Sequence, residues 1–440
     1  MKYLLSLIIV ANGLIGFCQN SEVLSLSLDN AITLAKQKNT QLLNASLDVK
    51  HARTQVSEVL SIGLPQIDGN ADFNHTFEVP TQIIPGDFVG QPGTNIAVQF
   101  GVPFNANASI GVSQLLFDGT FFLGLKASSE FVKISELSAS ATEIDVKEAV
   151  AKAYYMALIA EQNLEQLKTS YKNMVQLQSE TEAMYKAGFA EKLDVDRIIL
   201  AVSNLNVTLT RVTNQTILTQ QLLLNTIGIN INQKIELTTP LPSTVENNLS
   251  SSNFDPHSRI EIKMLDQQQL LNELDLKRYR VGYMPSLYGN FSYGSSTFAV
   301  EDQFSDLGND WYENGRYGVG LKLPLFDGFY KKSKIDQAKI KIKKTENTRI
   351  QALRGIDLEL NQTKNAYEEA QKTLELQKRN KRLAEDIYKT TSLKFREGVG
   401  SSFEMITADN EFTQAKINYL NALYELNIAY VNLKKAYGIL

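Results

Sequence analysis

Two acidic residues occupy equivalent places 210 residues apart, Asp194 and Glu404, each six residues after a glycine. Arg197 lies three residues after Asp194, one helical turn away, and this spacing predicts a local salt bridge. Thr407 has the same spacing from Glu404. An acid at the start of a helix is stabilised by the helix dipole, and this structural interpretation of Glu404 requires no ligand. In a narrow opening, the same carboxylate would attract cations.

No other residues form a recognisable catalytic or metal-binding pattern. The three histidines, His51, His75 and His257, lie outside motif spacing of one another, and the only cysteine is Cys18. The sequence contains neither a Gly-x-Ser-x-Gly motif nor a phosphate-binding loop. The remaining carboxylates are scattered over predicted helix faces. We therefore expect no enzyme activity, no cofactor and no metal site.

The N-terminus and the composition indicate an exported, folded protein. Residues 1–18 resemble a signal peptide: Lys2 precedes an apolar stretch, and Gly16 and Cys18 precede a cut before Gln19. A lipid-anchored Cys18 or a short transmembrane helix are the alternatives. No later apolar run approaches the ~20 residues of a spanning helix. With 43% hydrophobic and 21% charged residues and a net charge of −4, the composition does not suggest nucleic-acid binding.

An internal duplication organises the chain. Residues 185–229 align without a gap to residues 395–439, so that Gly188 matches Gly398 and Gly228 matches Gly438. Leu-Phe-Asp-Gly recurs at 116–119 and 325–328, and a related proline motif occurs at 64–67 and 284–287. The chain is thus predicted to comprise a first repeat, 19–229, an irregular linker, 230–255, and a second repeat, 256–440.

Each repeat contains two segments of about 9–11 residues that alternate apolar and polar side chains, with the alternation at 67–74, 106–113, 286–293 and 316–323. Strands of this length can span a bilayer when tilted, although a small soluble sheet would alternate in the same way. Aromatic residues gather where these strands give way to helices, as an interfacial girdle would; they are Phe117, Phe121, Phe122, Phe326, Phe329 and Tyr330. The connections 78–105 and 299–315 are expected to be long loops. Four strands cannot close in lipid, whereas three subunits would supply twelve.

Very long helices follow the strands. Residues 120–186 and 329–397 contain no proline and one glycine each, which predicts helices of about 100 Å. The return helix carries an apolar stripe in which large residues alternate with alanine; it comprises Met405, Ala408, Phe412, Ala415, Tyr419, Ala422, Leu426, Ala429, Leu433 and Ala436. A second seam runs through Phe403, Ile406, Ile417, Leu420 and Tyr424. Two seams indicate neighbours on both sides, as in the wall of a tube; a hairpin with one buried seam is the simpler alternative.

The turns between the long helices complete the pattern. They run from Tyr185 to Asp194 and from Phe395 to Glu404, with Gly188 and Gly398 in position to end the preceding helix. The chain resembles the TolC-like outer-membrane efflux protein family over essentially its whole mature length. The resemblance rests on the duplicated order of elements, the Tyr-x-x-Gly-x4-Leu-Asp-Val turn at 185–195 and its partner at 395–405.

The resemblance implies a mainly α fold with a small β part. It implies a homotrimer whose twelve strands form a barrel in outer-membrane lipid of a Gram-negative bacterium, continued by an α-helical tube in the periplasm. The turns would dock a periplasmic adaptor (membrane-fusion) protein that leads to an inner-membrane transporter, through Tyr185, Gly188, Leu193, Phe395, Gly398 and Phe403. The implied function is a passive exit duct for efflux. A duct for type I protein secretion, or a periplasmic coiled-coil scaffold, are the alternatives.

In this family, acids just after the second turn surround the constricted entrance. Glu404 occupies the first such place here, whereas Thr407 stands where the second acid would be. The resemblance therefore implies a periplasmic aperture formed by Glu404, Thr407, Asp194 and Arg197, with one tier of acids in place of two.

Overall fold

A computed structural model describes residues 23–90, 92–242, 254–300 and 310–440. The predicted signal peptide, 1–18, lies outside the described residues. The chain divides into two compact units that each draw on both repeats. We call residues 1–47, 137–264 and 350–440 the helical unit, and residues 48–136 and 265–349 the sheet unit. The two sequence repeats therefore do not correspond to the two structural units.

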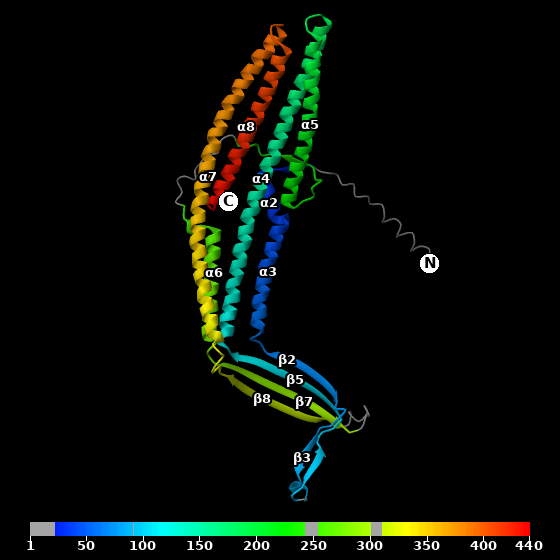
Figure 1. The fold of residues 1–440 in the computed structure, drawn as a ribbon, viewed down its shortest axis with the longest axis vertical. Coiled ribbons are helices and arrows are strands. Elements are labelled where there is room, and N and C mark those ends of the chain that lie inside the picture. Colours follow the sequence, from blue (N-terminus) through cyan, green and yellow to red (C-terminus); the bar gives the residue numbers. More distant parts are fainter. Residues whose placement is uncertain (1–22, 91, 243–253, 301–309) are drawn as a thin grey trace, which may run out of the picture. The chain divides into compact units, whose positions relative to one another are not determined.

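The predicted long helices are present at nearly the expected bounds. They are α4 (Gly119–Lys186) and α7 (Tyr330–Arg396), followed by the return helices α5 (Lys192–Ile227) and α8 (Ser402–Ala436). Figure 1 shows each return helix beside the helix that precedes it. Among the described residues, no helix is both long enough and apolar enough to cross a membrane.

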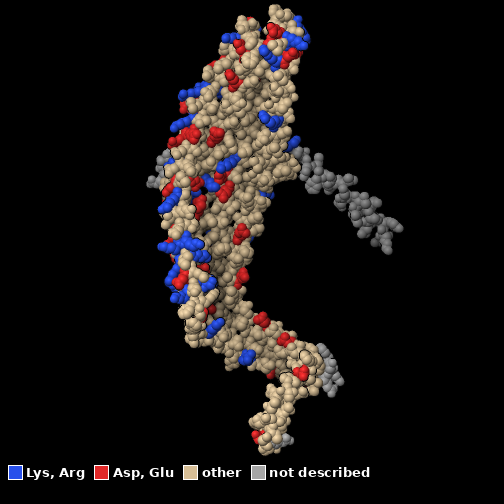
Figure 2. Space-filling view, viewed as in Figure 1, with Lys and Arg blue, Asp and Glu red and all other residues tan. Residues whose placement is uncertain are grey.

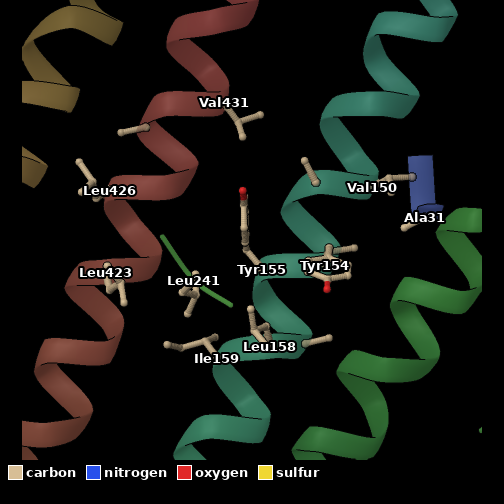
Figure 3. Close-up of a cluster of buried hydrophobic side chains, with 14 of the residues drawn as sticks. Ala31, Val150, Tyr154, Tyr155, Leu158, Ile159, Leu241, Leu423, Leu426 and Val431 are labelled. Atoms are coloured by element: carbon tan, nitrogen blue, oxygen red, sulfur yellow. The ribbon is translucent and has the colours of Figure 1, made fainter. Parts of the chain in front are cut away.

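The core of the helical unit forms where these helices meet the N-terminal segment (Figure 3). Tyr154 of α4 is fully buried, and its hydroxyl donates to the Leu26 carbonyl and accepts from the Thr239 amide, both at 3.0 Å. Leu26 belongs to β1 (Leu24–Leu26), which pairs in parallel with β6 (Ile235–Leu237). The segment 230–255, expected to be irregular, therefore contributes a short strand; residues 243–253 of it lie outside the description.

The predicted stripe on α8 forms part of this packing. Of its ten members, Phe412, Ala415 and Tyr419 are half-buried and the other seven are buried. The second seam remains more open in the single chain: Phe403 is exposed, and the other members are half-buried. One face of α8 is thus used within the chain, and the second seam is left incompletely covered.

The helices before the strands differ between the repeats. In the first repeat, α2 (Leu28–Lys38) and α3 (Thr40–Ser61) are separated at Asn39, whose side chain accepts from the amides of Gln41 and Leu42 and so caps α3. In the second repeat, a 3-10 turn, η3 (Pro256–Ser258), precedes a single helix, α6 (Ile260–Val281). The break follows from the capping side chain of Asn39.

The four predicted strands form one antiparallel sheet in the order β2-β5-β7-β8. Their bounds are Gln66–His75, Phe104–Phe117, Ser286–Ala299 and Tyr312–Lys322. The connection expected as a loop at 78–105 is itself a hairpin, β3 (Thr81–Pro85) and β4 (Asn95–Gln99), around the 3-10 turn η1 (Gly86–Val89). In the connection 299–315, residues 301–309 lie outside the described residues, and β8 already begins at Tyr312.

The register aligns the apolar positions of the four strands. Ile67 pairs with Val112, Val112 with Phe291, and Phe291 with Tyr317, so one apolar row crosses the whole sheet. Three of these side chains are exposed within the chain, with Ile67 at 70%, Phe291 at 47% and Tyr317 at 88%, and Val112 is half-buried. The sheet therefore presents apolar side chains instead of enclosing them in a core.

Candidate functional site at the two hairpin turns

Both turns of the helical unit end their first helix in the same way. Gly188 and Gly398 adopt the left-handed conformation, with φ of 82° and 75°. The Gly188 amide donates to the Tyr185 carbonyl at 3.0 Å, and the Gly398 amide donates to the Phe395 carbonyl at 3.1 Å. A side chain at either position would be strained by this φ. The glycines predicted to stop α4 and α7 are confirmed in that role.

The following helices also begin alike. In the second turn the amide of Glu404 donates to Ser401 Oγ at 3.2 Å, and the Ser401 amide donates to Glu404 Oε2 at 3.3 Å, which together form a capping box. In the first turn the Glu191 amide donates to Asp194 Oδ2 at 3.3 Å. Asp194 and Glu404 therefore both fold back onto the start of their own helix, and for Glu404 this agrees with the structural interpretation.

The salt bridge expected between Asp194 and Arg197 is not among the ion pairs of the described residues. Asp194 instead accepts a short hydrogen bond from the Ser402 hydroxyl of the other turn, in addition to the one from the Glu191 amide. Arg197 is exposed and lines a groove of about 450 Å³ that also includes Phe403. The Asp194 carboxylate accepts from the Glu191 amide and the Ser402 hydroxyl. The Arg197 side chain lines the groove instead.

Ser402 was missed by sequence reasoning, although it joins the two turns. It is the first residue of α8 and is buried. The tandem Ser401-Ser402 could have indicated this contact. One serine suffices to cap the helix, and the hydroxyl of the second can then bond to another group. At the equivalent place the first turn carries Lys192, which is exposed and has no such contact.

The residues predicted to form the docking tips divide by exposure. Tyr185, Leu193 and Phe403 are exposed, whereas Phe395 is 6% exposed and packs with Met405 and Ile198. Two further apolar residues that sequence reasoning missed stand out at the turns: Phe189 is 81% exposed and Val399 is 77% exposed. Each follows the turn glycine, and the repeat alignment matches them to each other.

Thr407, the last residue assigned to the aperture, makes only a local contact. Its hydroxyl donates to the Phe403 carbonyl at 2.8 Å within α8, and the residue is half-buried. Glu404, in contrast, is exposed to solvent in the single chain. The capping contacts of Glu404 explain how α8 begins. They do not prevent the exposed carboxylate from having a second role.

A buried polar cluster lies farther along the same helices, and sequence reasoning did not identify it. Asp409 of α8 is 4% exposed and accepts from Ser170 Oγ of α4 at 2.8 Å, while Thr413 Oγ1 donates to Ser170 Oγ at 3.2 Å. Burial raises the pKa of Asp409, and the hydrogen bond from Ser170 offsets this only in part. Burial also raises the pKa of Tyr388 of α7, with the charge of Asp409 adding to the effect.

The described residues contain no group of three or more His, Cys, Asp or Glu side chains that could hold a metal ion. The arrangement at the turns is one of helix caps, an inter-turn hydrogen bond and exposed apolar side chains. Exposed apolar side chains of this kind are typical of a surface that contacts another protein.

The chain is similar in sequence and fold to known outer-membrane proteins. The chain is 22% identical to the outer membrane protein TolC of Vibrio cholerae over 435 residues, covering 96% of this chain and 92% of that one. Its fold is similar to that of a membrane protein from Pseudomonas aeruginosa, with a TM-score of 0.72, 17% identity and 93% of both chains covered.

The outer membrane protein VceC of V. cholerae is similar as well, with a TM-score of 0.71 at 14% identity, covering 93% of this chain and 96% of that one. The profile of the outer membrane efflux protein family matches residues 31–228 and 267–439. These residues make up most of both repeats, and the chain therefore belongs to the outer membrane efflux protein family.

Proposed function

We propose that this protein is the outer-membrane exit duct of a tripartite efflux system, through which small molecules pass passively from a periplasm-spanning pump to the exterior. The sheet is the observation that carries the proposal. Its apolar rows are exposed, and both of its outer strands, β2 and β8, have one edge without a partner strand in the described chain. Lipid tolerates an apolar face but not open strand edges.

Pairing between copies of the chain would remove those edges. The strands alternate in direction across the sheet, so β2 of one copy runs antiparallel to β8 of the next. Three copies would close a barrel of about twelve strands, within the range of outer-membrane barrels. The partly open second seam on α8 provides a surface on which neighbouring helical units could pack into a tube.

Aromatic residues at the end of the sheet support its placement in lipid. Phe326 and Phe329 lie edge to face with their ring centres 5.5 Å apart, and both are exposed. Phe117 and Phe122 form a similar pair, 6.1 Å apart, in the first repeat. Exposed rings at both equivalent junctions are what an interfacial girdle requires.

The turns are proposed to form the periplasmic mouth and to dock the adaptor protein. The exposed apolar residues Phe189, Leu193, Val399 and Phe403 form the contact surface, and Tyr185 extends it. Phe395 supports that surface from the core, while Gly188 and Gly398 fix its backbone. We propose Glu404 as the acid that lines the aperture, together with Thr407 of the second turn and with Asp194 and Arg197 of the first.

Disulfide crosslinking between copies tests the proposal. We suggest Asn70→Cys on β2 combined in turn with Asn314→Cys, Arg316→Cys or Gly318→Cys on β8, which the register places on the same face of the sheet as Asn70. Oxidation of outer-membrane fractions should give a covalent trimer for at least one combination, while each single variant stays monomeric on denaturing gels. A water-soluble monomer with no crosslink in any combination would instead support the periplasmic scaffold.

A further inference from the structure

The sheet–helix junctions of the two repeats differ in charge. In the second repeat, residues 275–282 and 327–334 contain six basic and two acidic residues, a net charge of +4. The equivalent residues of the first repeat, 55–62 and 118–125, contain two acidic residues and no basic one, a net charge of −2. Because both junctions have the same order of elements, the fold does not explain why their charges differ.

Some of the six cations are neutralised within the chain. Arg278 pairs with Asp275 at 2.9 Å, and Lys331 pairs with Asp327 at 3.2 Å. Within the described residues, no ion pair is formed by the other four, Lys277, Arg280, Lys332 and Lys334. Lys277, Arg280 and Lys332 are exposed, and Lys334 is half-buried. We call these four residues the basic junction.

The basic junction lies beside aromatic rings. Lys332 Nζ is 5.9 Å from the ring centre of Phe329, and Lys334 Nζ is 5.6 Å from that of Tyr330. Lys331 Nζ lies 5.2 Å from the ring of Tyr283, which connects the end of α6 to the start of α7. Figure 2 shows Lys and Arg side chains gathered over this pair of helices.

We propose that the basic junction binds the headgroups of anionic phospholipids in the leaflet that faces the helices. The inference rests on the proposed placement of the sheet in lipid. Exposed rings of Phe and Tyr favour the membrane interface, and lysine and arginine next to them lie at the depth of the phosphate groups. Clustered cations at that depth attract anionic lipids over zwitterionic ones.

A lipid explains the neighbouring rings better than a free anion does. Small inorganic anions would gain from the cations but not from the aromatic residues, which contact the glycerol and acyl region of a lipid. The acidic junction of the first repeat would repel the same headgroups. A trimer should therefore carry separate anionic-lipid sites that alternate with sites lacking this preference.

Spin-labelled lipids measure this selectivity. The full mature protein is reconstituted in phosphatidylcholine vesicles with a trace of spin-labelled phosphatidylglycerol or spin-labelled phosphatidylcholine, and the motion-restricted fraction gives the relative association. We expect a preference of about fivefold for phosphatidylglycerol, weakened by high salt. Replacing all four residues of the basic junction with Gln should reduce it to about one.

A matched variant controls for total charge. Lys344→Gln, Lys372→Gln, Lys378→Gln and Arg382→Gln remove four exposed cations farther along α7 and should leave the preference intact. The proposal is overturned if the natural protein shows no preference, if this control loses it equally, or if millimolar inorganic phosphate abolishes it. Vesicle conductance separates the two ideas: a conducting trimer without lipid preference refutes only the lipid site, whereas failure to insert refutes the placement in lipid.

Discussion

The two helical hairpins share one backbone design but differ in their polar contacts. The same residues of each turn, 210 positions apart, form the glycine stop and the folded-back acid. Yet Asp194 of the first turn reaches across to Ser402, and the second hairpin buries Asp409 where the first exposes Ile199. Duplication has thus preserved the geometry of the turns, while the contacts that join the hairpins depend on residues present in only one repeat.

The largest difference between the repeats should appear at their last glycines. Gly228 has a φ of 91°, and a Cβ there would lie 2.5 Å from the Lys38 carbonyl oxygen. Gly438 has a φ of 72°, but its nearest new contact would be the flexible Arg259 Cδ at 3.4 Å. We expect Gly228→Ala to destabilise the protein by about 3 kcal/mol and Gly438→Ala by about 1 kcal/mol.

Thermal unfolding of the two purified variants, followed by circular dichroism, checks this order. The backbone of Lys38 and Asn39 cannot move aside without disturbing the joint between α2 and α3. Equal unfolding midpoints for the two variants would mean that the backbone at Lys38 and Asn39 moves to accommodate the new Cβ. The two glycines would then be equally tolerant of substitution.

The inter-turn bond should give the next largest effect. Ser402→Ala removes the hydroxyl donor to Asp194, which is half-buried, and should reduce stability by about 1–2 kcal/mol. Because this bond joins the hairpins at the proposed mouth, we also expect a higher single-channel conductance in planar bilayers. Lys192→Ala, at the equivalent place in the first repeat, is the control and should change neither property; a Ser402→Ala channel identical to it would exclude the inter-turn bond from gating.

The buried acid predicts a pH-dependent difference between the hairpins. Because the raised pKa of Asp409 means that the folded protein holds this proton more tightly than the unfolded chain, its contribution is complete below the ordinary aspartate pKa of about 4. That contribution is lost as the pH rises through the raised value. Asp409→Asn stays neutral and should be more stable than the natural protein by about 1 kcal/mol at neutral pH.

Midpoints of unfolding measured across pH test the sign. The advantage of Asp409→Asn should vanish near pH 4, while Ile199→Asn should show no pH dependence. The charged and titratable neighbours of Asp409 are Tyr388 and Lys416, and burial lowers the pKa of that lysine. An advantage that persists unchanged in acid would mean that shape, and not charge, distinguishes the two side chains.

The sequence predicted those parts of the fold that local patterns determine. Period-two alternation located the four strands, the absence of proline located α4 and α7, and Gly188 and Gly398 located the turns. These features depend on neighbours within a few residues along the chain. The first of the two long connections was wrongly expected to be a loop, because the alternation in β3 and β4 covers only five residues each.

The contacts of the candidate site were harder to predict because they join distant residues. Ser402 and Asp194 are 208 positions apart, and Ser170 and Asp409 are 239 apart. Local spacing instead suggested that Asp194 would pair with Arg197, whereas the closer amide of Glu191 and the hydroxyl of Ser402 take the carboxylate. Which acid is buried depends on helix packing, and Asp409 does not differ in its local sequence from a solvated acid.

Glu404→Gln should have the smallest effect on stability and is the sharpest test of the second turn. Glutamine can still accept from the Ser401 amide, so the capping box survives, and we expect a change of only about 0.3–1 kcal/mol from the helix dipole. If Glu404 lines the aperture, the variant should nevertheless lose cation selectivity in planar bilayers, because only the charge has been removed. Glu425→Gln, an exposed acid farther along α8, should leave selectivity unchanged. Should both variants retain the selectivity of the natural channel, Glu404 would be a helix cap alone, and the two turns would be alike in this respect too.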